Sequence, residues 1–239
     1  MTSETSSILS DKYVPLRVRA YLRTPVVADA WLPLDGILLY QSVRNDLGPR
    51  AANIPGISLQ AQPKNGEMIG GRLPLKIVHA KDWYYCCSWA QWDAYADGQD
   101  AWSKRFDQAY SDLIDFSGRR GVIITGRGAY KGYRTPIFYR SALYVEWYCV
   151  GDAERIRYLL STVSHIGKKT VQGWGRVAKW EVEAIEKDKS IWDGNRLMRG
   201  IPIYHWPREL GTPRLGQYGI RAPYWDRRNQ MELVMPNGA

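Results

Sequence analysis

The sequence has little of the chemistry that metal sites and disulfide frameworks need. Its 239 residues include three cysteines, three histidines and three phenylalanines. Cys86, Cys87 and Cys149 are an odd number of thiols, and their spacing is not that of metal ligands. We therefore expect buried, reduced thiols, no metal ion and no other cofactor.

Long apolar runs are also missing. No stretch approaches the ~20 apolar residues that a membrane-spanning helix needs. Residues 1–7 lack the basic and then apolar order of a signal peptide. These absences predict a cytoplasmic protein without a membrane partner. We expect a flexible N-terminal tail at residues 1–13 and a single domain at residues 14–239.

Acidic residues are scarce, and their scarcity is local. The chain has 33 lysines and arginines against 24 aspartates and glutamates, a net charge of +9 with a pI of about 9.4. Residues 117–145 and 155–180 contain no acid at all. A basic surplus favours nucleic acid or an anionic membrane as partner. The 11 tryptophans and 16 tyrosines suit base stacking, although many of them will belong to the core.

Residues 165–176, which we call the glycine loop, combine three glycines with lysines, an arginine and Trp174. The loop lies between an expected helix at 153–163 and an expected strand at 177–185. Glycines let a backbone approach a polyanion and point N–H groups at phosphate. The spacing is not that of a Walker loop, and the order of a dinucleotide-binding fingerprint is reversed. The pattern predicts a nucleic-acid loop; the alternative is a solvated glycine-rich connection.

Residues 117–140 are predicted to form a hairpin thumb, with a strand at 122–126, a glycine-rich tip and a returning strand. Tyrosines alternate at its tip with three cations, Arg127, Lys131 and Arg134. An acid-free finger of aromatic and basic residues is suited to single-stranded RNA. The alternative is a solvated charged face.

Residues 16–23 alternate in the manner of a half-buried strand. One face is apolar, and the other carries Arg17, Arg19, Tyr21 and Arg23. This second face could contact phosphates and bases. The alternative is an edge strand that its charges protect from pairing.

The remaining elements complete an α+β fold. We expect a ferredoxin-like or RNA-recognition-type core with the glycine-rich loop, a long insertion and the β-hairpin thumb. The other expected elements are a helix at 34–46, an irregular insertion at about 45–72, strands at 73–79, 83–89 and 142–150, a helix at 102–114, and an irregular C-terminal wrap at about 187–239.

Four motifs together resemble a known family. They are Leu34–Leu38, Gly128–Lys131, Gly167–Lys169 with Gln172–Arg176, and Leu197–Pro202. In this order they resemble the RAMP superfamily of CRISPR effector proteins over residues 14–204. They look most like the subunit of type IV class 1 complexes that caps the 5′ handle of the guide RNA.

The resemblance implies a non-catalytic subunit that binds the crRNA 5′ handle and contacts neighbouring backbone and large-subunit-like proteins. Contact with target DNA near its flanking motif is left open. The RNA-binding residues expected from the loop, the thumb and the first strand are Gly167, Lys168, Lys169, Gln172, Gly173, Trp174, Gly175, Arg176, Arg127, Lys131, Tyr133, Arg134, Arg17, Arg19 and Arg23.

Two alternatives compete with this hypothesis. Some relatives in the superfamily cut precursor RNA without a metal ion, and here His165 with Lys168 or Tyr130 would be the candidate base. A histidine at a helix end is more often structural. The second alternative is a general RNA-binding module with no link to CRISPR.

Overall fold

A computed structural model describes residues 12–48, 73–114 and 123–237. Most of the expected N-terminal tail, most of the expected insertion and residues 117–122 of the expected thumb lie outside these ranges.

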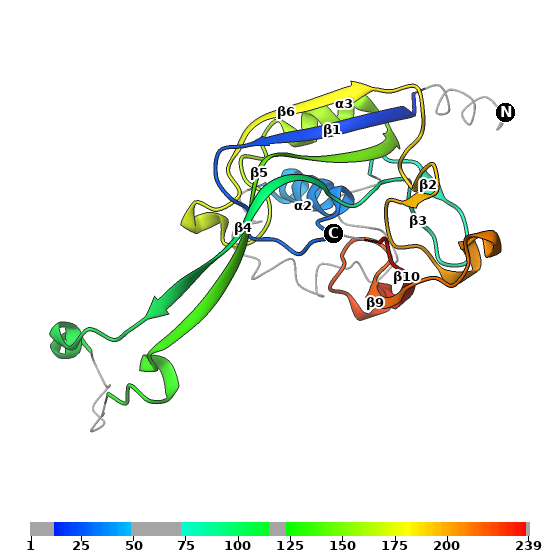
Figure 1. Cartoon of the computed structure of the whole chain (residues 1–239). Helices are drawn as coiled ribbons and strands as arrows, with labels where there is room; N and C mark the ends of the chain where they lie inside the picture. The colour runs from blue at the N-terminus through cyan, green and yellow to red at the C-terminus, as the bar shows by residue number, and fades with distance from the viewer. Residues whose placement is uncertain (1–11, 49–72, 115–122, 238–239) are drawn as a thin grey trace.

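The centre of the molecule is a four-stranded antiparallel sheet in the order β4-β5-β1-β6. A helix follows β1 and another follows β5, so the chain order is strand, helix, two strands, helix, strand. Figure 1 shows the two helices beside this sheet. The six elements are β1 (Val14–Leu22), α2 (Leu34–Leu47), β4 (Gln91–Lys104), β5 (Tyr133–Gly151), α3 (Ala153–Leu160) and β6 (Val177–Ala184).

Alternation in β1 decides which side of the sheet is covered. Leu16, Val18 and Ala20 are fully buried and pack with apolar residues of both helices. The intervening Arg17 and Arg19 are half-buried on the opposite side. The predicted division of this strand into two faces is therefore confirmed.

The two helices begin where their sequences predict. In α3, the carboxylate of Asp152 accepts hydrogen bonds from the backbone N–H groups of Glu154 and Arg155, each at 3.1 Å. This satisfies amide groups that a helix leaves without internal partners. Ile156 and Leu160, four residues apart, bury the same face of the helix. The expected helices at 34–46 and 153–163 are both present, the second ending at Leu160.

Strands β4 and β5 continue beyond the sheet as a projecting hairpin (Figure 1). Their pairing runs outward from Asp97 opposite Arg140 to Lys104 opposite Tyr133. Two short 3₁₀ turns lie at its far end, η3 (Gln108–Leu113) and η4 (Gly128–Tyr130).

Two expectations for this region are wrong. The expected helix at 102–114 is a strand up to Lys104 followed by η3. The returning strand of the expected thumb pairs with β4, and residues 123–126 form no strand. Pairing along the whole length of β5 outweighs local propensity here, as is common for strands.

Short elements make up the rest of the described chain. The segments expected as strands at 73–79 and 83–89 contain a two-residue strand each, and the region expected as an irregular wrap holds several short elements. They are β2 (Ile77–Val78) with β3 (Tyr84–Tyr85), β7 (Trp192–Asp193) with β8 (Arg196–Leu197), β9 (Leu215–Gly219) with β10 (Gln230–Val234), and 3₁₀ turns η5 (Thr170–Gln172), η6 (Ile203–His205), η7 (Arg208–Leu210) and η8 (Arg227–Asn229).

A second apolar cluster joins this C-terminal region to the body. It includes Trp89, Ile201 and Leu233, all nearly or fully buried. Gly200 lies against the ring of Trp89, where an added Cβ would be 2.6 Å from the nearest ring atom.

A buried polar network adjoins this cluster, because Arg199 contacts its residues Tyr84 and Ile220. The guanidinium of Arg199 is fully buried and donates hydrogen bonds to the carbonyl oxygens of Tyr85, Cys87 and Ile220. The carboxylate of Asp35, in the first turn of α2, accepts from the hydroxyl of Tyr224 at 2.8 Å. Burial raises the pKa of Asp35, and the positive charge of Arg199 opposes that rise. Two of the sequence motifs, 34–38 and 197–202, therefore meet inside the protein.

All three cysteines are buried as free thiols, as expected. No helix in the described ranges is both long and apolar enough to cross a bilayer.

Candidate nucleic-acid interface

The glycine loop is held by close backbone contacts within the protein. Gly175 has a φ of +70°, and a Cβ there would lie 1.9 Å from the carbonyl oxygen of Ile166. Gly167 has a φ of +82°, and its Cβ would lie 2.5 Å from the carbonyl oxygen of Val27. Both positions require glycine for conformation and for space.

The loop docks on residues 23–29, which follow β1. The N–H of Gly175 donates to the carbonyl of Pro25 at 2.8 Å, and the N–H of Lys168 donates to Val27 at 2.6 Å. The hydroxyl of Thr24 donates to the carbonyl of Gly173 and accepts from the N–H of Arg176, each at 2.8 Å. The sequence suggests that N–H groups of the loop point at phosphate. Instead, these three loop amides are hydrogen-bonded inside the protein. Charge in the loop must come from its side chains.

The loop also contacts the stem of the hairpin. The ring of Trp174 packs against Tyr139 of β5, with centroids 5.0 Å apart and planes 31° apart. The Nζ atom of Lys169 lies 5.3 Å from the ring centroid of Trp102 in β4. Trp102 in turn packs on Tyr133, with centroids 5.3 Å apart. The structure therefore brings the two acid-poor segments together.

Sequence reasoning missed Trp102 and Tyr139 as members of this junction. The sequence predicts a helix that begins at Trp102, and it does not distinguish Tyr139 from other strand residues. A two-residue period is the signal that could have found Tyr139, since Tyr133 and Tyr139 are an even number of residues apart in one strand.

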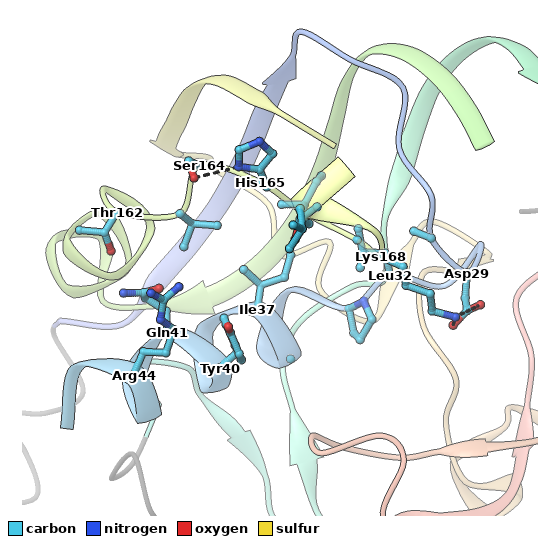
Figure 2. A pocket seen from close by; sticks show the side chains of 18 of the residues that line it. Asp29, Leu32, Ile37, Tyr40, Gln41, Arg44, Thr162, Ser164, His165 and Lys168 are labelled. Carbon is cyan, nitrogen blue, oxygen red and sulfur yellow. Dashed lines mark hydrogen bonds and ion pairs between the residues drawn. The ribbon is translucent and has the colours of Figure 1, made fainter. Parts of the chain in front are cut away.

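A groove of about 700 Å³ lies between α2 and residues 162–171, which include the first part of the glycine loop (Figure 2). Tyr40 and Arg44 line it from α2, and His165 and Lys168 line it from the other side. The Nδ1 atom of His165 is 2.9 Å from the hydroxyl of Ser164.

Tyr130 lies elsewhere, at the far end of the hairpin, where its ring packs on Phe106 with centroids 5.2 Å apart. The pair proposed for a ribonuclease from His165 and Tyr130 is not brought together. His165 and Lys168 do share the groove.

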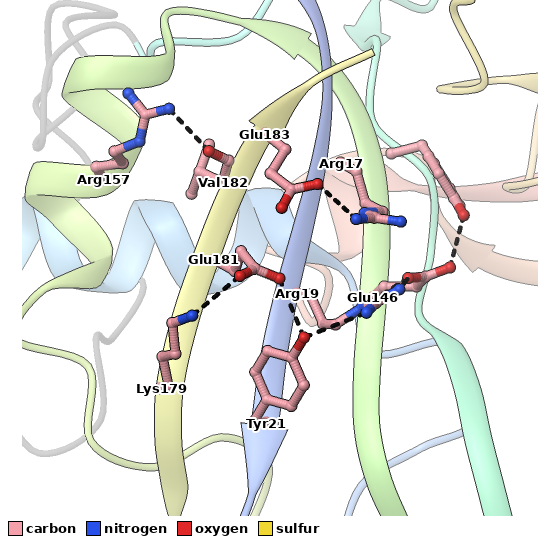
Figure 3. A network of polar contacts seen from close by, with 10 residues as sticks. Arg17, Arg19, Tyr21, Glu146, Arg157, Lys179, Glu181, Val182 and Glu183 are labelled. Atoms are coloured by element: carbon pink, nitrogen blue, oxygen red, sulfur yellow. Dashed lines mark hydrogen bonds and ion pairs between the residues drawn. The ribbon is translucent and has the colours of Figure 1, made fainter.

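Three of the expected RNA-binding cations already have acidic partners. Arg17 is ion-paired with Glu183 of β6, and Arg19 is ion-paired with Glu146 of β5 at 2.8 Å (Figure 3). Nζ of Lys168 is 2.9 Å from the carboxylate of Asp29.

The two arginine pairs belong to a network on the open side of the sheet. The hydroxyl of Tyr21 and Nζ of Lys179 both donate to Glu181, at 3.1 and 3.0 Å (Figure 3). The hydrogen bond from Lys179 lowers the pKa of Glu181. Neighbouring strands thus neutralise the charge of this face, which makes it a poor surface for a polyanion.

Six other expected cations form no ion pair with an acid in the part of the chain that the structure describes, and all six are exposed. Three lie at or near the docked loop and three at the outer part of the hairpin. The six are Arg23, Lys169, Arg176, Arg127, Lys131 and Arg134.

Arg23 and Arg176 are adjacent, since the N–H of Arg23 donates to the carbonyl of Arg176 at 2.8 Å. Gln172 is exposed in the same loop, and Tyr133 is 40% exposed on the hairpin. The six cations without an acidic partner among the described residues therefore lie along the glycine loop and the outer part of the hairpin.

Comparison with known families decides the identity of the chain. The family described as CRISPR type IV associated protein Csf3 matches residues 14–236. This chain belongs to the Csf3 family. The expectation of a type IV CRISPR protein is therefore confirmed at the level of the family.

Two further comparisons add no argument about the function of this Csf3 family member. No curated protein matches the chain. Among solved structures, it is similar to a chain of the "Cryo-EM structure of the Type III-B Cmr-beta bound to cognate target RNA", with 11% identity and a TM-score of 0.35. That likeness covers 76% of this chain and 64% of the other.

Proposed function

We propose that this protein is a non-catalytic RNA-binding subunit of a type IV CRISPR ribonucleoprotein, and that it holds the 5′ handle of the guide RNA. The observation that carries the proposal is the contact between the glycine loop and the hairpin, through Lys169 with Trp102 and Trp174 with Tyr139. This contact places aromatic rings beside exposed cations that have no acidic partner among the described residues, as single-strand binding requires. Membership of the Csf3 family supports the CRISPR context.

The proposed fold is a ferredoxin-like core in which the β4–β5 hairpin acts as the thumb. The chain order and the spatial order β4-β5-β1-β6 support this assignment. RNA-recognition folds of this kind bind bases on the open side of the sheet. Here that side carries the Arg17–Glu183 and Arg19–Glu146 pairs, so we place the RNA at the edge where the loop meets the hairpin.

The proposed partners are the crRNA handle and the adjacent backbone and large-subunit-like proteins of the complex. The handle would cross the loop near Lys169 and Arg176 and pass toward the hairpin. Arg17 and Arg19 would contribute less than these unpaired cations, because a phosphate would compete with a carboxylate for each arginine.

Binding of a labelled repeat-derived RNA, measured against salt concentration, tests the proposal. Removing two phosphate contacts from a single strand should lower the slope of log K against log salt by about 1.4. We expect this loss for Lys169→Ala with Arg176→Ala. Arg17→Ala with Arg19→Ala is the matched control, which should leave the slope nearly unchanged. Absence of RNA binding, or an unchanged slope in the first variant, would refute the proposal.

The same RNA incubated with protein in EDTA tests the ribonuclease alternative. That alternative keeps one structural argument, since His165 and Lys168 share the groove. We expect intact RNA. Specific cleavage that His165→Ala abolishes would replace the capping function with metal-independent catalysis.

A further inference from the structure

A second, smaller hollow lies between residues 26–30 and the stem of the hairpin. Its volume is about 280 Å³, and its walls include Trp92, Asp97, Gly98, Tyr139 and Arg140. Ala28 and Asp29 line both this hollow and the groove beside α2, and the hollow adjoins the Tyr139–Trp174 contact. The other five wall residues named belong to β4 or β5.

Gly98 determines where the ring of Tyr139 lies. The two residues are directly opposed in the β4–β5 pairing. A Cβ on residue 98 would be 2.4 Å from both the Cζ and the Oη of Tyr139. The ring therefore lies across β4 over a position that has no side chain, and its contact with Trp174 depends on that space.

The polar part of the hollow is fixed. Nε of Arg140 donates to Asp97 at 2.9 Å, and the guanidinium lies 5.6 Å from the centroid of the Trp92 ring. The backbone of Arg140 exchanges two hydrogen bonds of 2.8 Å with Val26. Phe138, which directly precedes Tyr139 in β5, is 67% exposed. The hollow thus combines aromatic faces with a donor and an acceptor, the groups that bind an unstacked base.

We propose that this hollow binds one unstacked base of single-stranded RNA, with Tyr139 as the stacking face and Gly98 as the residue that positions it. The inference rests on the proposed function, because the strand is the one that the glycine loop holds. The base is bound by stacking, since Asp97 already balances the charge of Arg140. Trp174 supports the Tyr139 ring from the loop.

Two glycine variants separate positioning from folding. In Gly98→Ala the added methyl group displaces the outer end of a rotatable side chain, so Tyr139 swings away and the backbone is kept. Gly126→Ala is the control, since its Cβ would meet no atom within 4 Å and its φ is not positive. Gly98 lies within β4, and Gly126 lies between β4 and β5.

Affinity for repeat-derived RNA is measured for the wild type, Gly98→Ala, Gly126→Ala, Tyr139→Ala and the double variant Gly98→Ala/Tyr139→Ala. Loss of one base stack corresponds to about 5- to 150-fold weaker binding. We expect this loss in Gly98→Ala and in Tyr139→Ala, with no further loss when the two are combined. The salt slope should stay unchanged, because no phosphate contact is removed. Gly126→Ala should bind as the wild type does.

Wild-type affinity in Gly98→Ala would overturn the positioning role. The role would also be overturned if Gly98→Ala weakened RNA binding as much in the Tyr139→Ala protein as it does in the wild type. Wild-type affinity in Tyr139→Ala would overturn the base site itself, and this test does not depend on whether Gly98→Ala folds. If the wild type binds RNA and these variants bind equally well, the inference fails and the proposed function stands. If the wild type binds no RNA, both fail.

Discussion

Single residues in the glycine loop have a different role from the one that their types suggest. The sequence predicts glycines that let a backbone approach phosphate. In the structure, Gly167 and Gly175 let the loop approach the carbonyl groups of Val27 and Ile166. The residue types identified the loop, but the close partner lies 140 positions earlier for Gly167. A single sequence gives no sign of which distant carbonyl a glycine will meet.

Gly175→Ala should therefore destabilise the protein more than Gly173→Ala. Both glycines have positive φ, which costs about 1–2 kcal/mol for alanine. At residue 173 an added Cβ meets no atom within 4 Å, whereas at residue 175 it overlaps a backbone oxygen. Urea unfolding gives the two free energies, and equal losses would show that the loop is not docked as described. Gly175→Ala should also weaken RNA binding, because the loop would leave the hairpin.

At the scale of elements, β1, α2, α3 and β6 could be predicted from periodicity and β4 could not. Strands β1 and β6 and helix α3 each keep an apolar face, and α2 buries the apolar residues Leu34, Leu38 and Val43. In β4 the register shifts between Trp92 and Ala94 and again between Ala94 and Ala96. Such irregularities interrupt the alternation of faces by which a strand is recognised. The returning strand of the thumb was recognised, but its partner was placed at 122–126 because that segment is closer in sequence.

Shortening the hairpin tests its role as an element. Lys104 and Tyr133 are paired, so an Asn-Gly turn can join them in place of residues 105–132. We expect RNA affinity to fall and the salt slope to decrease by at least about 1.4, since the deleted residues include Arg127 and Lys131 among five cations. The thermal stability should change little, because the apolar core lies elsewhere.

The matched control keeps the hairpin and changes only its charge, as Arg127→Ala with Lys131→Ala. It should lower the slope by about 1.4, the part of the change that belongs to these two cations. A shortened protein with wild-type affinity would show that the outer hairpin does not contact this RNA.

At the scale of the whole molecule, Asp35 and Arg199 connect the start of α2 to the C-terminal region. Each was noticed in the sequence, Asp35 as a first-turn acid and Arg199 within a short motif. Their proximity could not be predicted, because 164 residues separate them and the intervening chain crosses the sheet several times. The C-terminal region was expected to be irregular for the same reason, since its strands are short and find their partners only in three dimensions.

Arg199→Met should destabilise the protein by about 3–5 kcal/mol, because it leaves a buried carboxylate without its cation and three carbonyls without their donor. The loss should depend on pH. Burial raises the pKa of Asp35, so the folded state binds a proton more tightly than the unfolded state does. The contribution of Asp35 to the free energy of unfolding therefore falls as the pH rises above the ordinary pKa of aspartate.

The variant should accordingly lose less stability at pH 5 than at pH 8, as urea unfolding at the two values will show. Adding Asp35→Asn should recover part of the loss at pH 8, because it removes the isolated charge. A loss that is independent of pH would mean that the carboxylate is not coupled to Arg199.

The docking of the glycine loop has a consequence for the order of events in the cell. Its supports are residues 23–29, made early in translation, and the stem of the hairpin, made midway. The loop itself follows both supports in the chain. A nascent chain therefore carries the cations of the hairpin before it has made the loop that docks on the hairpin stem.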